Sequence, residues 1–210
     1  REGIEHLTHL KNLSLTNNPK LNLENVLEQL QNLPALEKLN LSHNALTNIP
    51  KNIKGLTALK NLRLSNNNIV DAKSYVHLSK LNKLKILWLD NNKIEVLPST
   101  LGNLSQLKEL YLGNNSIAEL PNEIIKCKKL RVLYLGNNQL TELSPIFLKM
   151  KLRMLVLYGN QIREIPPVYQ KLRNPLTILV LDNNFLNEAE QKKARKYFKG
   201  FILLSMQNQR

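Results

Sequence analysis

Side chains that support catalysis or hold metal ions are sparse in this sequence of 210 residues. His6 and His9 could lie on one side of a helical turn, but two ligands without a third do not make a metal site. Cys127, the only cysteine, stands where comparable segments carry leucine, so we expect it in the core. None of the motifs G-x-S-x-G, H-E-x-x-H, G-x-G-x-x-G or the phosphate-binding P-loop occurs. The sequence therefore predicts no enzyme activity, no metal and no cofactor.

Residues suited to binding a partner are more abundant than catalytic ones. Aromatic and aliphatic side chains alternate with leucine in several short segments. Trp and Tyr are frequent anchors of protein interfaces, and a contiguous exposed apolar patch commonly marks an interaction site. If these segments are strands of one sheet, their outward side chains share one face. The residues expected to bind a protein partner there are Arg63, Ile86, Trp88, Asp90, Glu109, Tyr111, Val132, Tyr134, Met154, Val156, Tyr158, Ile178 and Val180.

Two neighbouring positions refine this expectation. Gly113 and Gly136 should leave room beside Tyr111 and Tyr134 for the backbone of a partner. The alternative is that tyrosine and glycine are inherited with a duplicated unit, and that β-branched residues are present because they favour strands. Trp88 and Tyr158 depart from their counterparts in the neighbouring segments and are therefore the more informative members of the set.

A second candidate is electrostatic, since the chain has 30 Lys and Arg against 16 Asp and Glu, a net charge of +14. A row of cations precedes the alternating segments, and its central members are Lys60, Lys85, Lys108, Arg131 and Arg153. Such a basic edge could bind sulfated glycans, anionic surfaces or nucleic acid. It could equally serve solubility and steering alone. The sequence carries no nucleic-acid-binding motif, so nucleic acid is the least favoured partner.

The elements that position these residues follow from a repeat. The pattern L-x-x-L-x-L-x-x-N occurs eight times, in a chain with 45 leucines and 29 asparagines. Its asparagines are 22 to 26 residues apart, at Asn18, Asn44, Asn67, Asn92, Asn115, Asn138, Asn160 and Asn184. The x-L-x-L-x part alternates as a strand does, and apolar residues at three-residue steps follow it, as in a 3₁₀ turn.

Stacking of such units explains both residue types. One unit cannot bury its leucines alone, but parallel neighbours bury them together. The asparagine amide has donors and an acceptor, so it can satisfy buried backbone groups where each strand turns. The predicted fold is an α/β solenoid with a parallel sheet on its concave face and short helices and 3₁₀ turns on its convex face. A membrane span is not expected, because no run of 18 apolar residues occurs.

The regular pattern is interrupted in four places. Residues Leu23–Leu33 and Asp71–Leu81 are insertions that resemble amphipathic helices, with Asp71 as an N-cap. Residues 1–9 resemble the end of a repeat, with Ile4, Leu7 and Leu10 in core positions, so either a unit precedes them or this turn covers the edge. Residues 187–210 are expected to form a capping helix and strand. We therefore predict a single domain, 1–210, with about eight repeats over 10–186.

The segment Leu120–Leu143, LPNEIIKCKKLRVLYLGNNQLTEL, shows the unit at its most regular. It resembles the 23-residue class of leucine-rich repeats found in Ras-suppressor-type proteins. The words LYLGNNSIAEL and LYLGNNQLTEL are more similar still to the repeats of leucine-rich repeat proteins of pathogenic Leptospira. This resemblance implies a horseshoe-shaped solenoid that binds protein on its concave face, without catalytic residues. We expect the chain to be a monomer. The resemblance also implies a bacterial protein acting at the host interface, secreted or on the cell surface, with the cytoplasm as the alternative location.

Overall fold

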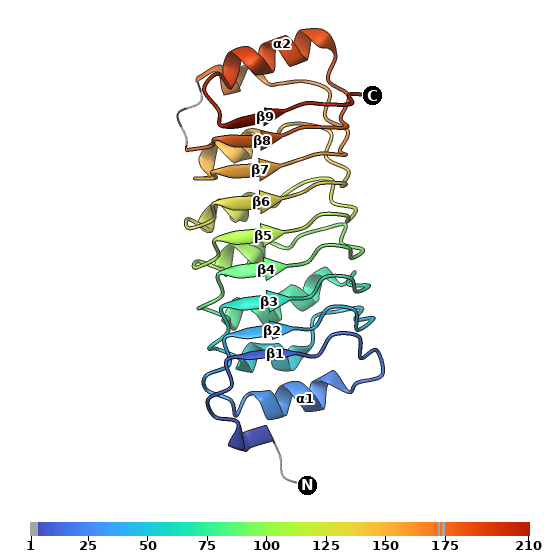
Figure 1. Ribbon diagram of the computed structural model, residues 1–210, viewed down its shortest axis with the longest axis vertical. Coiled ribbons are helices and arrows are strands. Elements are labelled where there is room, and N and C mark those ends of the chain that lie inside the picture. Colours follow the sequence, from blue (N-terminus) through green and yellow to red (C-terminus); the bar gives the residue numbers. More distant parts are fainter. Residues whose placement is uncertain (1–3, 172, 174) are drawn as a thin grey trace.

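The computed structural model describes residues 4–171, 173 and 175–210, and these form a parallel sheet whose nine strands follow one another in sequence order (Figure 1). The sheet is open, and Figure 1 shows its strands stacked along the long axis of the molecule, with 3₁₀ helices behind the sheet and α1 and α2 at its two ends. The strands are β1 (Asn12–Ser14), β2 (Lys38–Asn40), β3 (Asn61–Arg63), β4 (Ile86–Trp88), β5 (Glu109–Tyr111), β6 (Val132–Tyr134), β7 (Met154–Val156), β8 (Ile178–Val180) and β9 (Leu203–Ser205). The predicted solenoid architecture is confirmed.

The strand register stacks equivalent residues of successive units. The central leucines align from Leu13 in β1 through Leu87 in β4 to Leu204 in β9. From Leu39 to Leu179 these central leucines are at most 1% exposed, because each lies between the leucines of two neighbouring units. Side chains on either side of the central leucine point away from the core, as the pleat of a strand requires.

The asparagines satisfy the backbone where each strand turns, as predicted. Asn67 is representative: its amide nitrogen donates to the carbonyls of Leu41 and Leu64, at 3.1 and 2.8 Å. Its side-chain oxygen accepts from the backbone N–H groups of Asn44 and Leu46, at 2.9 and 3.1 Å. One side chain therefore ties its own turn to the turn of the preceding unit. An aspartate could not do this, because an ionised carboxylate has no donor.

Short helices and 3₁₀ turns cover the other side of the sheet. They are η1 (Ile4–His6), α1 (Leu23–Leu30), η2 (Lys51–Gly55), η3 (Ala72–Lys80), η4 (Ser99–Asn103), η5 (Asn122–Lys126), η6 (Pro145–Lys149), η7 (Pro167–Lys171) and α2 (Glu188–Tyr197). Cys127, next to η5, is buried as expected.

The two insertions differ in helix type. The first forms the α-helix α1, whose buried residues Leu23, Leu27 and Leu30 are spaced by four and three residues. The second, also predicted to be an amphipathic helix, forms the 3₁₀ helix η3. Its buried residues Tyr75 and Leu78 are three apart, which places them on one line of a helix with three residues per turn. Asp71 does cap it, because its carboxylate accepts from the N–H of Lys73 at 2.9 Å.

The first turn departs from its expected packing. The N–H of Leu7 donates to Ile4 and the N–H of Leu10 to Leu7, as in the complete units. Ile4 and Leu10 pack against the core, but Leu7 is 51% exposed, so its predicted core position was wrong. The reason is geometric, because within the described residues no element lies over that side of η1.

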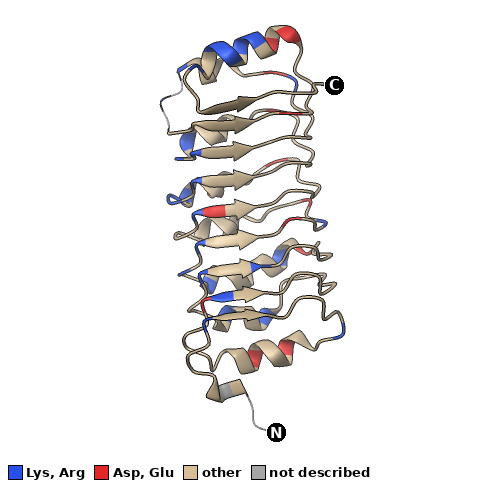
Figure 2. Ribbon diagram, in the orientation of Figure 1, with Lys and Arg blue, Asp and Glu red and all other residues tan. Residues whose placement is uncertain are grey.

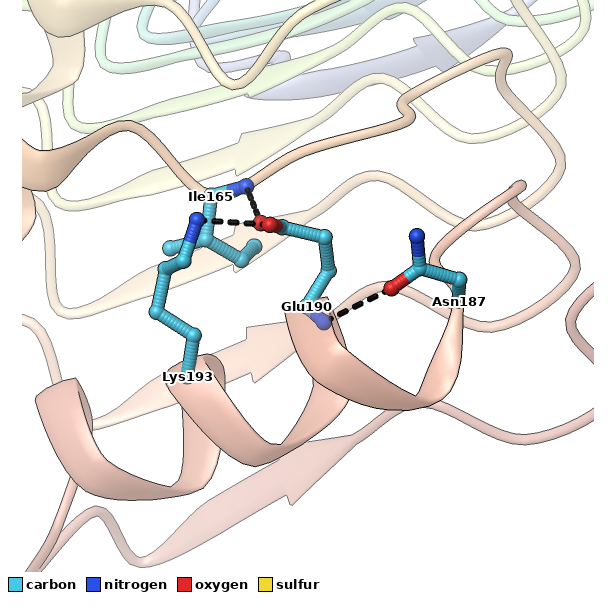
Figure 3. A network of polar contacts seen from close by, with 4 residues as sticks. All are labelled: Ile165, Asn187, Glu190 and Lys193. Carbon is cyan, nitrogen blue, oxygen red and sulfur yellow. Dashed lines mark hydrogen bonds and ion pairs between the residues drawn. The ribbon is translucent and has the colours of Figure 1, made fainter.

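At the other end, α2 lies over the last unit and is fixed to it by Glu190 (Figure 3). The carboxylate of Glu190 accepts from the backbone N–H of Ile165 and from the ammonium of Lys193, both at 2.6 Å. The side chain of Asn187 caps the helix by accepting from the N–H of Glu190 at 2.9 Å.

Beyond α2, the strand β9 belongs to a ninth, degenerate unit that the sequence analysis missed. Phe201, Leu204, Met206 and Gln209 have the spacing of the repeat, with phenylalanine, methionine and glutamine in place of two leucines and the asparagine. Gln209 performs the task of the missing asparagine: its side-chain oxygen accepts from Leu186 at 3.0 Å, and its amide donates to the carbonyl of Leu181 at 2.8 Å.

Candidate partner-binding surface

The predicted binding residues lie on the face of the sheet turned away from the helices, which we call the open face (Figure 1). It comprises the first and third residues of each strand and the residue two positions after the strand. Of the thirteen predicted residues, Arg63 is exposed, Val156 is buried and the other eleven are half-buried. The register places them in contiguous rows across β3 to β8.

A stack of rings crosses the middle of the open face. Trp88, Tyr111 and Tyr134 are the third residues of β4, β5 and β6, and the register pairs them directly. The rings of Trp88 and Tyr111 are nearly parallel, with centroids 3.7 Å apart and 2° between their planes. Tyr134 continues the stack, with its ring centroid 5.0 Å from that of Tyr111. The guanidinium of Arg63, from β3, lies 4.9 Å from the centre of the Trp88 ring.

This arrangement changes what Trp88 can offer a partner. One side of the indole carries Arg63 and the other carries Tyr111, so both faces of the ring are already in contact. The indole nitrogen is buried and, among the described residues, has no hydrogen-bond partner. A partner therefore meets the edges of the rings rather than their faces.

Polar groups beside the stack form hydrogen bonds within one repeat unit and between adjacent units. The hydroxyl of Tyr111 donates to the carboxylate of Glu109 at 2.8 Å. Burial, together with the adjacent Glu109 carboxylate, raises the pKa of Tyr111 above its usual value. The carboxylate of Asp90 accepts from the N–H of Gly113 at 2.9 Å and, more weakly, from the hydroxyl of Ser65 at 3.4 Å. Burial nevertheless raises the pKa of Asp90. Asp90 and Glu109 thus already have partners within the fold.

The far end of the open face differs from the prediction in two respects. Val156 was expected to be exposed, but it is only 5% exposed and is therefore closed to a partner.

The space expected beside the glycines is also occupied. A Cβ on Gly136 would lie 2.4 Å from the ring of Tyr158, and one on Gly113 would lie 3.2 Å from the Asp90 carboxylate. These glycines admit side chains of the protein itself, so the prediction that they leave room for a partner's backbone was wrong.

The structure also has a feature that the sequence analysis missed. Two adjoining hollows of about 360 and 570 Å³ lie on the polar part of the open face, over β1 to β4. Arg63 and Asn40 line both of them. The signal was present in the sequence, because Ser14 and Asn40 occupy the strand position at which later units carry the rings of Trp88, Tyr111 and Tyr134.

The basic edge lies where the strands begin. Figure 2 shows lysine and arginine gathered along that side of the sheet and on α2. Lys60 pairs with Glu37 at 2.6 Å, and this hydrogen bond holds the pKa of Glu37 below its usual value. The guanidinium of Arg131 donates to the backbone carbonyls of Lys128 and Leu130, both at 2.9 Å. Among the described residues, Lys85, Lys108 and Arg153 form no ion pair.

Within the described ranges, no cluster of three or more His, Cys, Asp or Glu side chains could hold a metal ion. No helix in that part of the chain is long and apolar enough to cross a membrane.

Known proteins resemble the chain in both sequence and structure. Family models described as "Leucine rich repeat", "Leucine Rich Repeat" and "Leucine Rich repeats (2 copies)" match residues 8–69, 83–104 and 105–147. No curated protein matches the sequence significantly.

Among solved structures, a leucine-rich repeat protein of Leptospira interrogans has 28% identity and a TM-score of 0.79, covering 99% of this chain and 57% of its own. An internalin (inlF) of Listeria monocytogenes has 26% identity and a TM-score of 0.74, covering 97% and 57%. Internalin C2 of the same organism has 32% identity and a TM-score of 0.68, covering 86% and 74%. The chain thus spans little more than half the length of the first two.

Leucine-rich repeat domains are a general scaffold for protein–protein interaction and are typically non-catalytic. The family matches, the identity with internalin C2 and the asparagine-tied stack of strands agree on one assignment. The chain belongs to the leucine-rich repeat family, and it resembles the leucine-rich repeat proteins of Leptospira.

Proposed function

We propose that this chain is a non-catalytic recognition module that binds a protein partner on its open face, the concave face of the horseshoe. The observation that carries the proposal is the ring stack of Trp88, Tyr111 and Tyr134. Half-buried aliphatic side chains continue the apolar surface on both sides of the stack, at Ile86, Val132, Met154, Ile178 and Val180. An apolar surface of this kind, rimmed by polar residues, is typical of an interaction site.

The stack suits binding because it is formed before a partner arrives. Rings that already pack against each other lose little conformational freedom on association, which lowers the entropic cost of binding. Their exposed edges carry partial positive charge, while their negative faces are turned toward one another. Carbonyl and carboxylate oxygens of a partner would therefore meet the ring edges, and its apolar side chains would cover Val132 and Met154.

We infer the biological setting from the comparisons. The similar structures include a Leptospira protein and two Listeria internalins. On that basis we propose that the chain comes from a bacterium, acts outside the cytoplasm, and binds a host protein as a monomer.

The test is a double substitution in the stack, Tyr111→Ala with Tyr134→Ala, which leaves Trp88 as a fluorescent reporter. A partner is first recovered by affinity purification from host-cell extract, and its affinity is then measured directly with the purified protein. We expect a loss of at least about 30-fold, since truncation of an interface hot spot costs about 2 kcal/mol or more. Binding of the partner to the wild type should also shift Trp88 emission.

The control is Tyr197→Ala, which removes a half-buried tyrosine from α2 and not from the open face. It should leave the affinity within about twofold, as expected of a residue outside the interface. Equal affinities for the wild type and the stack variant would refute the proposal.

A second candidate is a polyanion bound along the basic edge, which is favoured by the three cations Lys85, Lys108 and Arg153 that lack an ion pair within the described residues. Sulfated glycans and anionic surfaces are the ligands of this alternative. It predicts a steep fall in affinity with salt, because each neutralised charge releases counterions. A contact confined to the aromatic stack predicts a shallow dependence, so a steep dependence would show that cations of the chain contribute to binding.

A further inference from the structure

The polar hollow beside the ring stack has a charge pattern of its own. Four side chains of β2 and β3 face it: Lys38 and Asn40 from β2, and Asn61 and Arg63 from β3. The register pairs Lys38 with Asn61 and Asn40 with Arg63. The four therefore stand at the corners of a rectangle of about 4.8 by 6.6 Å, with the two cations on one diagonal.

The four groups present donors to the hollow. The side-chain oxygen of Asn40 accepts from the backbone N–H of Ser42 at 3.0 Å, which leaves its amino group to face outward. Lys38 and Arg63 are both exposed, and neither forms an ion pair within the described residues. Contact with the Trp88 ring limits the conformations of the Arg63 guanidinium, so this cation is partly positioned in advance.

No carboxylate compensates these charges inside the first hollow, whose lining is Asn12, Leu13, Ser14, Lys38, Leu39, Asn40, Asn61 and Arg63. Glu37 lies at the nearby edge but is paired with Lys60. Asp90 lines the second hollow and is held by Gly113. Two cations and an oriented amide around an empty volume of about 360 Å³ complement an anion, and a planar guanidinium matches a carboxylate in particular.

We propose that Lys38, Asn40, Asn61 and Arg63 form a carboxylate-binding cradle that receives Asp or Glu side chains of an acidic segment of the partner. This rests on the proposed function, because the partner is taken to be a protein that also covers the adjoining ring stack. Arg63 lies between the cradle and the ring stack, so a partner segment whose carboxylate binds Arg63 would also contact the positive edges of the rings. The proposed partner is therefore a protein segment that carries acidic residues for the cradle beside apolar residues for the ring stack.

The test uses an N-acetylated, C-amidated octa-glutamate peptide with a fluorescent label, which carries only side-chain carboxylates. Its affinity is measured by fluorescence anisotropy at about 50 mM salt, where surface charges are weakly screened. The variant Lys38→Gln with Arg63→Gln should bind about tenfold more weakly, equivalent to about 1.4 kcal/mol. The same peptide with glutamine in place of glutamate should not bind the wild type.

The matched control is Lys54→Gln with Arg163→Gln, which removes the same two charges elsewhere. Arg163 also lies over an aromatic ring, that of Phe185 at 4.8 Å, so it reproduces the chemistry of Arg63 without the cradle. This control should weaken peptide binding less than threefold, an expectation for nonspecific charge alone. An equal loss in both variants, or no binding of the peptide to the wild type, overturns the proposal.

A sulfated hexasaccharide forms the second arm. If the cradle variant loses the saccharide and retains the peptide, the site is a sulfate site and the proposal fails. Failure of the cradle is distinct from failure of the proposed function. A wild-type protein that loses its partner on Tyr111→Ala with Tyr134→Ala, but not on Lys38→Gln with Arg63→Gln, retains the recognition surface without a carboxylate-binding site.

Discussion

Replacement of Asn67 tests the asparagine contacts that hold the strands in position. The side-chain oxygen of Asn67 accepts from the N–H groups of Asn44 and Leu46. Its amide donates to the carbonyls of Leu41 and Leu64, but these carbonyls also accept from the asparagines of neighbouring units. Asn67→Ala therefore leaves two N–H groups without an acceptor, the buried one of Asn44 and the half-buried one of Leu46, while each carbonyl keeps one donor.

The expected cost follows from those two groups. An unsatisfied buried donor costs about 1–3 kcal/mol, so Asn67→Ala should lower the free energy of unfolding by about 2–6 kcal/mol. Asn67→Asp keeps the acceptors and loses the donors, so its carboxylate would face two carbonyl oxygens. Its destabilisation should therefore shrink in acid, where the protonated aspartate can donate again. Asn67→Ala should show no such relief.

Urea unfolding followed by circular dichroism and by Trp88 fluorescence gives both quantities, at about pH 7 and about pH 4. The exposed Asn48 provides the control, and Asn48→Ala should change stability by less than about 0.5 kcal/mol. A cost for Asn67→Ala as small as that of the control would refute the role assigned to these side chains. So would equal pH profiles for the alanine and aspartate variants.

Three other outcomes are expected. Burial raises the pKa of Asp90, so the stability that protonated Asp90 contributes is present at low pH and is lost as pH rises through its folded pKa. Asp90→Asn can still accept from the N–H of Gly113 and carries no charge at any pH. Urea titrations should therefore show this variant gaining stability relative to the wild type from about pH 3 to about pH 7. Burial raises the pKa of the Cys127 thiol to about 11, so Ellman's reagent at about pH 8 should label it only after unfolding, and rapid labelling of the folded protein would contradict its place in the core. Gln209→Ala should accelerate hydrogen exchange at the amide of Leu186, and unchanged exchange would remove Gln209 from its assigned position.

The fold could be predicted from the sequence because each constraint is repeated. A leucine at the centre of a strand, such as Leu87, lies between two equivalent leucines, so one rule applies from Leu39 to Leu179. Prediction failed where that symmetry ends. Among the described residues, Leu7 has a neighbouring unit on one side only. The unit that follows the predicted capping helix carries Gln209 in place of the asparagine, and this longer side chain still bonds to Leu186 and Leu181 of the preceding unit.

The open face was less predictable, for a different reason. The register that pairs Trp88 with Tyr111 follows from the repeat, so their proximity could be anticipated. Whether a side chain extends toward solvent or folds onto its neighbour depends on its rotamer, which the repeat does not determine. Tyr158 bends over Gly136, and Asp90 bonds to the next strand. Over β1 to β4 the smaller side chains do not fold over their neighbours in this way, so a hollow remains there.

Arg63 connects the two proposed surfaces, and its position predicts how they depend on each other. Its guanidinium covers one face of Trp88 and at the same time borders both hollows. A carboxylate that draws the guanidinium away from the indole must replace the cation–π contact, which is worth about 0.5–1 kcal/mol at exposed sites. A carboxylate that binds with the stack intact keeps that contact, so the favoured geometry places the anion at the far edge of the guanidinium, toward Lys38. The acidic and apolar parts of a partner would then bind side by side across β2 to β6 without competing for the same group.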